Sequence, residues 1–457
     1  MQNTILNIAL VSIFDKVFRP HQIMEKAKET GFVRRNDGKL LPMTFVKAMT
    51  IGIINNTKVS LENIACKCEE IQEELQITKE ALYQRFNNGI ELMKAIFEMS
   101  LTYTLENTKS ITNINILSQF ENLYICDSTS LPVSEKLMDI FPSSGGSNKK
   151  GSIKLQAIFN ITTRNFKKLE FFKGTNNDRQ YVNNIVEITK KKDLVIFDLG
   201  YFTKAAFYNI EAKEAYYVSR VSFTTVFSTE TENHEIKRIN ILEIFKKSNG
   251  IVDTSVVIGY GKEHIKCRLV AIKLPEDVAN ERRRKAKLNS KRKTLPDYQL
   301  EFLGWNVMIT NTPANMLPKD AVFDIYRIRW QIEIIFKSLK SNLNLDKLSI
   351  GGKAQTQCIL YGRLILATLL TSVYSNVYEL IYNTKNREVS ILKFFSIIKS
   401  KYSSILQILS KSIIDFKALT KLFFGIAQKS LYEKRKRKST VELINQYTPS
   451  NFLPKFA

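Results

Sequence analysis

The spacing of apolar residues separates the chain into helical ends and a mixed middle. Apolar residues recur every three or four positions in 5–18 and 42–54, which predicts a helical region from residue 1 to about 110. The same spacing returns over 345–457, which is also predicted to be helical. Neither region contains the long alternation of apolar and polar residues that is typical of a half-buried strand.

The middle of the chain alternates strand-like and helix-like segments. A strand is predicted at 122–126, NLYIC, and a second, buried one begins at Asp193, contains the apolar run LVIF and stops at Gly200. Three strands, a helix, a strand, a helix and a strand would form a mixed α/β sheet. The further strands are predicted at 153–160, 168–174, 215–221 and 302–310, the helices at 178–188 and 203–214, and a Ser-, Gly- and Lys-rich loop at 142–151.

Residues 222–300 separate the early strands of this sheet from the last one. They contain two strand-like runs, VDTSVVIGYG and HIKCRLVAIKL, followed by a charged stretch over 281–293. The charged stretch could contact DNA or could be a solvated helix face.

One long helix is predicted from residue 324 to about 343, and its polar residues gather on one side. A helix advances about 100° per residue, so Tyr326, Arg329, Glu333 and Lys340 share an arc of roughly 60° beside an apolar stripe. The arc could be a solvated, salt-bridged face, because Arg329 and Glu333 are four residues apart. Alternatively, a carboxylate among cations and a phenol could be a metal ligand beside groups that bind phosphate.

The charge balance favours a polyanionic partner. The 457 residues include 68 Lys and Arg against 44 Asp and Glu, a formal net charge of +24. Because no lipidation motif is present, nucleic acid is favoured over a membrane surface. A basic run at 434–438 could be a tail, a solvated face or a non-specific DNA contact.

Cysteine and histidine usage excludes several other kinds of site. Five scattered cysteines do not form a disulfide framework and suit a reducing cytosol, and Cys66 with Cys68 lacks the second pair of a zinc site. Three distant histidines make a Ser-His-Asp triad or a histidine metal cluster improbable. The N-terminus lacks the basic region of a signal peptide, and the apolar run at 364–374 is too short to cross a bilayer and is predicted to be a buried helix.

The spacing of the four polar residues carries a resemblance to a known family. The pattern Tyr326-x2-Arg329-x3-Glu333-x6-Lys340 resembles the signature of bacterial insertion-sequence transposases, the IS-four branch of the DDE enzymes. The sequence GFVRR at 31–35 resembles the N-terminal segment of the same family. The resemblance implies an α/β, ribonuclease-H-like catalytic core with a β-rich insertion and helical regions at both ends. The domains expected are a helical DNA-binding region at 1–115, the core at 116–221 and 301–345, the insertion at 222–300 and a helical region at 346–457.

Two aspartates complete the catalytic set that the resemblance implies. Asp127 and Asp198 each directly follow an apolar strand, and residues at the carboxyl ends of strands line the active crevice of open α/β sheets. An aspartate after a strand more often forms a turn or caps a helix. Those roles explain poorly why two such aspartates occur in one chain with Glu333. Three carboxylates can hold two Mg²⁺ or Mn²⁺ ions that activate a water or a 3′-hydroxyl. Arg329 and Lys340 are then expected to bind phosphate.

The resemblance also implies a reaction and partners. It implies cut-and-paste transposition, with nicking at the element ends, a hairpin intermediate and strand transfer into target DNA. The partner would be double-stranded DNA, both the terminal inverted repeats and the target, bound by a homodimer in a synaptic complex. Such a protein would act on the nucleoid in the bacterial cytoplasm.

The two tryptophans match positions at which hairpin-forming relatives hold a flipped base. Trp305 and Trp330 are therefore expected to bind that base, with Tyr326 on the adjacent DNA backbone. Core packing is the alternative for Trp305, which lies in an apolar strand.

Other readings of the chain stay open. The segment 78–86 could be a DNA-contacting helix or a packing helix. The whole chain could instead be a nuclease or resolvase of the same fold that does not join strands, or an inactive DNA-binding relative.

Overall fold

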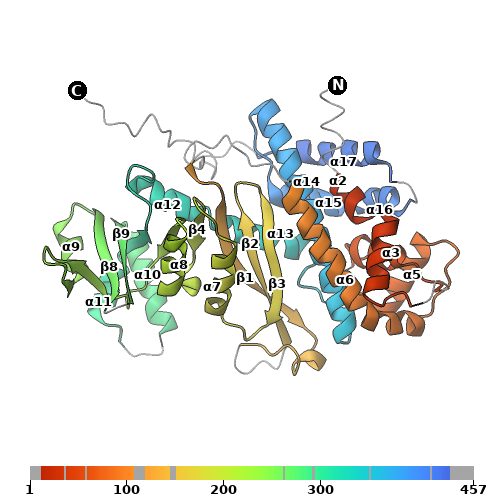
Figure 1. Cartoon of the computed structure of the whole chain (residues 1–457), viewed down its shortest axis with the longest axis horizontal. Coiled ribbons are helices and arrows are strands. Elements are labelled where there is room, and N and C mark those ends of the chain that lie inside the picture. Colours follow the sequence, from red (N-terminus) through yellow and green to blue (C-terminus); the bar gives the residue numbers. More distant parts are fainter. Residues whose placement is uncertain are drawn as a thin grey trace. The chain divides into compact units, whose positions relative to one another are not determined.

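The computed structural model describes most of the chain and divides it into two compact units that interleave along the sequence (Figure 1). Unit 1 contains Met1–Ile111, Asp127–Asn176 and Gln331–Arg435, and unit 2 contains Thr112–Cys126, Asn177–Trp330 and Lys436–Ala457. Residues 1–11 of the predicted helical region and the basic run at 434–438 lie outside the described residues, as do most of the loop at 142–151 and the end of the charged stretch. The residues described are 12–34, 38–56, 59–107, 119–144, 151–260, 263–290, 294–348, 351–411 and 414–432.

The first part of unit 1 is helical, as its apolar spacing predicts. Local signals start several helices: α3 and α4 begin on a proline, and Ser60 caps α5 in a reciprocal capping box with Asn63. Thr78, at the head of the segment 78–86, accepts a hydrogen bond from the Ala81 amide at 3.3 Å where α6 begins. The elements are α2 (Ser12–Val17), α3 (Pro20–Glu29), α4 (Pro42–Lys47), the π-helix η1 (Ala48–Gly52), α5 (Leu61–Ile71) and α6 (Lys79–Asn107).

The second helical part of unit 1 is built around α14 (Lys353–Lys385). This helix is long and apolar enough to cross a membrane, but 94% of its most apolar window is buried inside the protein, as expected of a core helix. Helix α14 packs against α6 and η1, and glycines allow the close approach. A Cβ at Gly89 of α6 would lie 3.3 Å from the Cys358 sulfur of α14, and a Cβ at Gly362 of α14 would collide with the carbonyl oxygen of Met49 in η1. The remaining helices are α13 (Trp330–Asn342), α15 (Ile391–Ser400), α16 (Tyr402–Ser410) and α17 (Phe416–Lys429).

Unit 1 also holds a hairpin of β2 (Gly151–Asn160) and β3 (Asn165–Lys173), in which Leu155 pairs with Phe171. Strand β1 (Leu123–Val133) precedes the hairpin, and only its first four residues belong to unit 2. The prediction that this strand ends at residue 126 is wrong. The strand continues past Asp127 because it has a second neighbour in β2, and its burial alternates, with Leu131 and Val133 buried.

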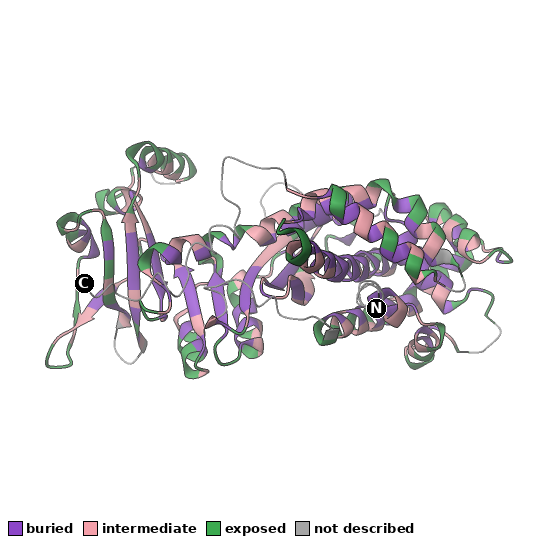
Figure 2. Cartoon of the chain, turned by 90° about the horizontal axis from the view of Figure 1, so that it is seen from above, coloured by how far each residue is buried: buried purple, intermediate pink, exposed green. Residues whose placement is uncertain are grey.

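Unit 2 contains the parallel part of the sheet. β4 (Leu194–Phe197) pairs with β1 on one side and with β5 (Tyr216–Arg220) on the other, all in parallel. Helices α7 (Asp178–Ile188) and α8 (Lys204–Ala212) connect these strands, close to their predicted bounds. All four β4 residues are buried, and Figure 2 shows the inner strands coloured as buried over much of their length.

The region expected to be a β-rich insertion extends the same sheet. The strands follow the order β3-β2-β1-β4-β5-β10-β9-β8-β6-β7. Strands β1 to β5 and β10 lie in the segments predicted to form the core, 116–221 and 301–345. β10 (Trp305–Thr310) pairs antiparallel with both β5 and β9, so it joins the insertion to the core. The other elements are β6 (Phe227–Glu230), β7 (Ile236–Arg238), α9 (Ile241–Lys247), β8 (Ile251–Tyr260), β9 (Glu263–Lys273), α10 (Glu276–Asn289) and α11 (Asp297–Phe302).

The single helix predicted at 324–343 is wrong. The chain forms α12 (Lys319–Arg327), a turn at Ile328 and Arg329, and then α13. In the turn the amides of these two residues donate to carbonyls only three residues back, at 3.0 and 3.1 Å, which interrupts the regular helical ladder. The calculated arc therefore does not extend from Tyr326 to Lys340, although Glu333 and Lys340 still share α13.

Candidate functional site

A cavity in unit 1 brings together three of the predicted site residues. Asp127 of β1 and Glu333 and Lys340 of α13 line a space of about 560 Å³. Glu333 and Lys340 are seven residues apart, close to two full helical turns, so both face the cavity from one side of α13. The charged side chains of the lining are Asp127, Glu333, Lys337, Lys340, Asp346 and Lys347.

Lys340 is held against the strand that carries Asp127. Its Nζ donates to the carbonyl oxygen of Ser130 at 3.1 Å. Burial lowers the pKa of the Lys340 ammonium, and the negative charge of Asp346 opposes that effect. The cavity thus contains a partly dehydrated ammonium group, which an anionic ligand would stabilise.

Unit 2 forms a separate cluster around Asp198. The buried strand β4 ends at Phe197, and a 3-10 turn at Leu199–Tyr201 follows, so Asp198 lies directly at the strand's carboxyl end. The Tyr326 hydroxyl donates to Asp198 Oδ1 at 3.2 Å, and Arg329 Nε lies 3.8 Å from the same oxygen. Both contacts use Oδ1, so neither occupies the second carboxylate oxygen.

The groups that contact Asp198 are largely withdrawn from solvent. Tyr326 is 7% exposed and Arg329 8%. Burial raises the pKa of the Tyr326 phenol, and the nearby Asp198 carboxylate raises it further, so the hydroxyl remains a proton donor well above neutral pH. Arg329 lies in the turn between α12 and α13, and its contact with Asp198 gives a physical reason for the break in the predicted helix.

The two tryptophans have different environments. Trp305, on β10, is half-buried and stacks on Phe245, with ring centroids 4.6 Å apart. Trp330 is 57% exposed, and the Arg329 guanidinium lies 5.7 Å from its ring. Packing against Phe245 therefore explains part of the burial of Trp305, whereas the Trp330 indole is largely exposed to solvent.

Sequence reasoning missed two cations beside the Asp198 cluster. Arg282 of α10 donates to the Trp305 carbonyl oxygen at 3.4 Å, and its pKa is lowered by burial and by the positive charge of Arg220. The charge of Arg220 also acts on Tyr326. Arg282 belongs to the charged stretch, and it lies three residues after Ala279 and four before Ala286, so this helical spacing with two small apolar residues was the signal that could have found it.

The predicted carboxylates thus appear in two groups, Asp127 with Glu333 in unit 1 and Asp198 in unit 2. Within the described residues, no three His, Cys, Asp or Glu side chains are grouped as metal ligands. The donor chemistry nevertheless suits Mg²⁺ or Mn²⁺, which prefer carboxylate oxygens.

Comparison with known proteins identifies the family. A family model described as "Transposase DDE domain" matches residues 118–369, more than half of the chain. The transposase of insertion sequence element IS1151 from Clostridium perfringens is 28% identical over 447 residues, which cover 91% of this chain and 92% of that protein. The transposase of IS231F from Bacillus thuringiensis subsp. israelensis is 27% identical over 451 residues, 94% of this chain and 93% of that protein.

A solved structure also aligns with the chain. The cryo-EM structure of a piggyBac transposase synaptic complex with hairpin DNA aligns with a TM-score of 0.45 and 12% identity, covering 95% of this chain and 87% of that one. The family assignment depends on the family model and the two insertion-sequence relatives. The chain belongs to the DDE transposase family, in the IS-four branch that the spacing of its Tyr, Arg, Glu and Lys residues predicts.

Proposed function

We propose that this transposase moves its DNA element by a cut-and-paste reaction in which Asp127, Asp198 and Glu333 are the catalytic carboxylates. The observation that carries the proposal is the cavity in which Asp127 and Glu333 lie together with a partly desolvated lysine.

The carboxylates would hold two Mg²⁺ or Mn²⁺ ions, which supply activation of a water or 3′-hydroxyl and stabilisation of the leaving oxygen. The other residues have distinct roles. Tyr326 and Arg329 fix the rotamer of Asp198 through their contacts with Oδ1. Lys340 offers a point charge to a DNA phosphate in the unit 1 cavity, and Arg329 contributes positive charge beside Asp198 in unit 2.

The remaining steps follow from the same assignment. The partners are double-stranded DNA at the element ends and at the target, and the active form is a homodimer in a synaptic complex. A nick at the element end is followed by a hairpin, and Trp330 and Trp305 stack on a base that leaves the duplex. Extruding that base relieves the sharp bend of the backbone, and stacking on an indole offsets part of the unstacking cost.

The test is cleavage of end DNA by isosteric variants. Asp127→Asn, Asp198→Asn and Glu333→Gln should each abolish cleavage in Mg²⁺ while leaving binding of end DNA largely intact, because shape is kept and only charge is lost. Asp139→Asn, which removes a charge from an exposed site in unit 1, is the matched control and should cleave normally. Near-normal cleavage by Asp198→Asn would remove that residue from the site.

Strand-transfer assays separate transposition from cutting alone. A pre-cleaved end with a free 3′-hydroxyl should be joined to a target plasmid by the unmodified protein. Cleavage without any joining would instead indicate a nuclease or resolvase of the same fold.

A further inference from the structure

Asp346 lies in the cavity of unit 1, and the proposed reaction assigns it no role. It lines this space together with Lys340 and Lys347. Its side chain is 25% exposed, and Lys347 Nζ lies 3.7 Å from Oδ2. The other oxygen, Oδ1, is buried and has no hydrogen-bond partner among the described residues.

Arg363 of α14 lies behind this part of the cavity wall and is almost completely buried, with 1% exposure. Its Nη1 donates to the carbonyl oxygen of Lys347 at 2.7 Å. Its Nε and Nη2 are buried and have no hydrogen-bond partner within the described part of the chain. A buried guanidinium with one hydrogen bond is costly unless a counter-charge is near.

Asp346 supplies that counter-charge. Burial lowers the pKa of Arg363 to about 10, and the charge of Asp346 opposes the shift. Arg363 therefore holds the segment 346–347 through the Lys347 carbonyl, and its charge attracts Asp346. Helix α14, which carries Arg363, is largely buried in unit 1.

Asp346 also faces the cavity cation. Its charge opposes the effect of burial on the Lys340 ammonium, as it does for Arg363. The carboxylate thus has Lys347 as its ion-pair partner, and its charge also acts on Lys340 and the buried Arg363. This environment favours a role in orienting Lys340 over a role as a further metal ligand.

We propose that Asp346, anchored by Arg363, is a positioning residue that holds the Lys340 ammonium in the cavity for a DNA phosphate. The inference rests on the proposed function, which gives Lys340 its phosphate. Ser130 fixes Lys340 from the strand side through its carbonyl oxygen, and Asp346, which lines the same cavity, attracts it from the segment that follows α13.

The experiment is a double-mutant cycle on cleavage of end DNA in Mg²⁺. Asp346→Asn should slow cleavage roughly ten- to hundredfold, the size expected when a catalytic group is misplaced by about 1 Å, with end binding changed far less. In a Lys340→Met background, Asp346→Asn should have no further effect, because the group it positions is gone. Asp346→Glu should recover part of the activity, and Asp139→Asn is the surface control.

The outcomes separate the inference from the proposed function. If Lys340→Met and Glu333→Gln impair cleavage but Asp346→Asn does not, the positioning role is wrong and the proposed site stands. The same conclusion follows if the effect of Asp346→Asn persists unchanged in the Lys340→Met background. If Lys340→Met and Glu333→Gln both cleave normally, the proposed site itself is wrong. Circular dichroism and thermal unfolding check the fold. Should Asp346→Asn fold poorly, Asp346→Glu carries the test, and its partial loss must disappear in the Lys340→Met background.

Discussion

Removing one hydroxyl group tests whether Asp198 depends on its buried neighbour. Tyr326→Phe keeps the aromatic ring, which is 7% exposed, and deletes the donor that lies 3.2 Å from Asp198 Oδ1. The variant should fold normally, bind end DNA normally and cleave it more slowly.

The size of the effect follows from the geometry. A hydrogen bond to a charged group contributes about 1.5–3 kcal/mol. The observed 3.2 Å is longer than the roughly 2.5–2.7 Å of a strong hydroxyl–carboxylate bond, so the lower end applies. A loss of about 1.5 kcal/mol of transition-state stabilisation corresponds to about a tenfold slower reaction.

The assay is single-turnover nicking of a labelled end duplex in Mg²⁺ between pH 7 and pH 9. Because the pKa of Tyr326 is raised by burial, the phenol stays protonated and the ratio of wild-type to variant rates should be constant across this range. Tyr217→Phe is the matched control: Tyr217 is fully buried in the same unit, and its hydroxyl has no hydrogen-bond partner among the described residues. Equal rates for Tyr326→Phe and wild type, or an equal slowing by Tyr217→Phe, would refute the reasoning.

Three further predictions concern packing, pH and the tryptophans. Gly362→Ala should lower the free energy of unfolding by about 1–3 kcal/mol, because its Cβ meets a backbone carbonyl. Gly425→Ala, with open space around its Cβ, should raise it by about 0.5–1 kcal/mol. Urea unfolding measures both changes, and changes of the same sign would contradict the packing argument. Burial lowers the pKa of Lys47 from 10.5 to about 8, so the unfolded chain binds more protons than the folded chain between these pH values. The free energy of unfolding should therefore rise with pH in this range, and Lys47→Met should remove that rise. Trp330→Ala should slow hairpin formation more than the first nick and leave stability nearly unchanged, because the indole is exposed. Trp305→Ala should also slow hairpin formation more than the first nick, but it should lower stability, because its ring packs on Phe245. Hairpin formation at the wild-type rate by both variants would exclude the flipped-base role.

Local patterns predicted the regular elements well. The helix at 178–188 was found with the same bounds, because its apolar spacing is clear and the Asn177 side chain caps its first turn. β4 was recognisable as an apolar run between polar residues. The spacing from Tyr326 to Lys340, together with the two upstream aspartates Asp127 and Asp198, predicted the family, because a sequence spacing does not depend on whether the helix is continuous.

The structural features that the sequence did not predict depend on contacts between residues that are distant in the chain. Residues 128–130, Ser-Thr-Ser, resemble a loop, and only pairing with a neighbouring strand keeps them in β1. No glycine or proline marks the turn at Ile328 and Arg329, whose position follows from the side-chain contact with Asp198. Asp346 and Arg363 belong to a loop and a core helix, and nothing in their spacing indicates that a buried guanidinium needs that carboxylate.

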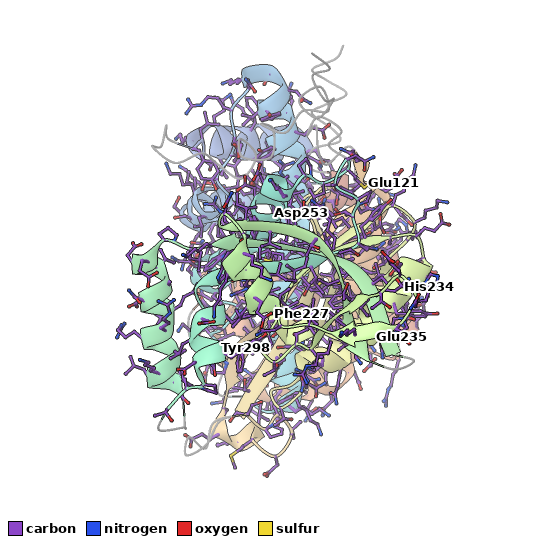
Figure 3. The ribbon with its side chains drawn as sticks, turned by 90° about the vertical axis from the view of Figure 1, so that its left-hand side faces the viewer. Glu121, Phe227, His234, Glu235, Asp253 and Tyr298 are labelled. Atoms are coloured by element: carbon purple, nitrogen blue, oxygen red, sulfur yellow. The ribbon has the colours of Figure 1, made fainter. Side chains whose placement is uncertain are left out.

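The two ends of the sheet bear on how copies of this chain can associate. β7 is an edge strand of only three residues, Ile236–Arg238, and its last two side chains are exposed cations. Figure 3 labels His234 and Glu235 in the turn that leads into it, where the His234 side chain is 89% exposed. At the other end, α6 and α14 pack against β3 (Figure 1). A short, basic edge repels a second copy and offers few main-chain groups, so it discourages growth into fibrils by strand addition. Any association between copies of this chain must then use side-chain surfaces rather than the β7 edge of the sheet.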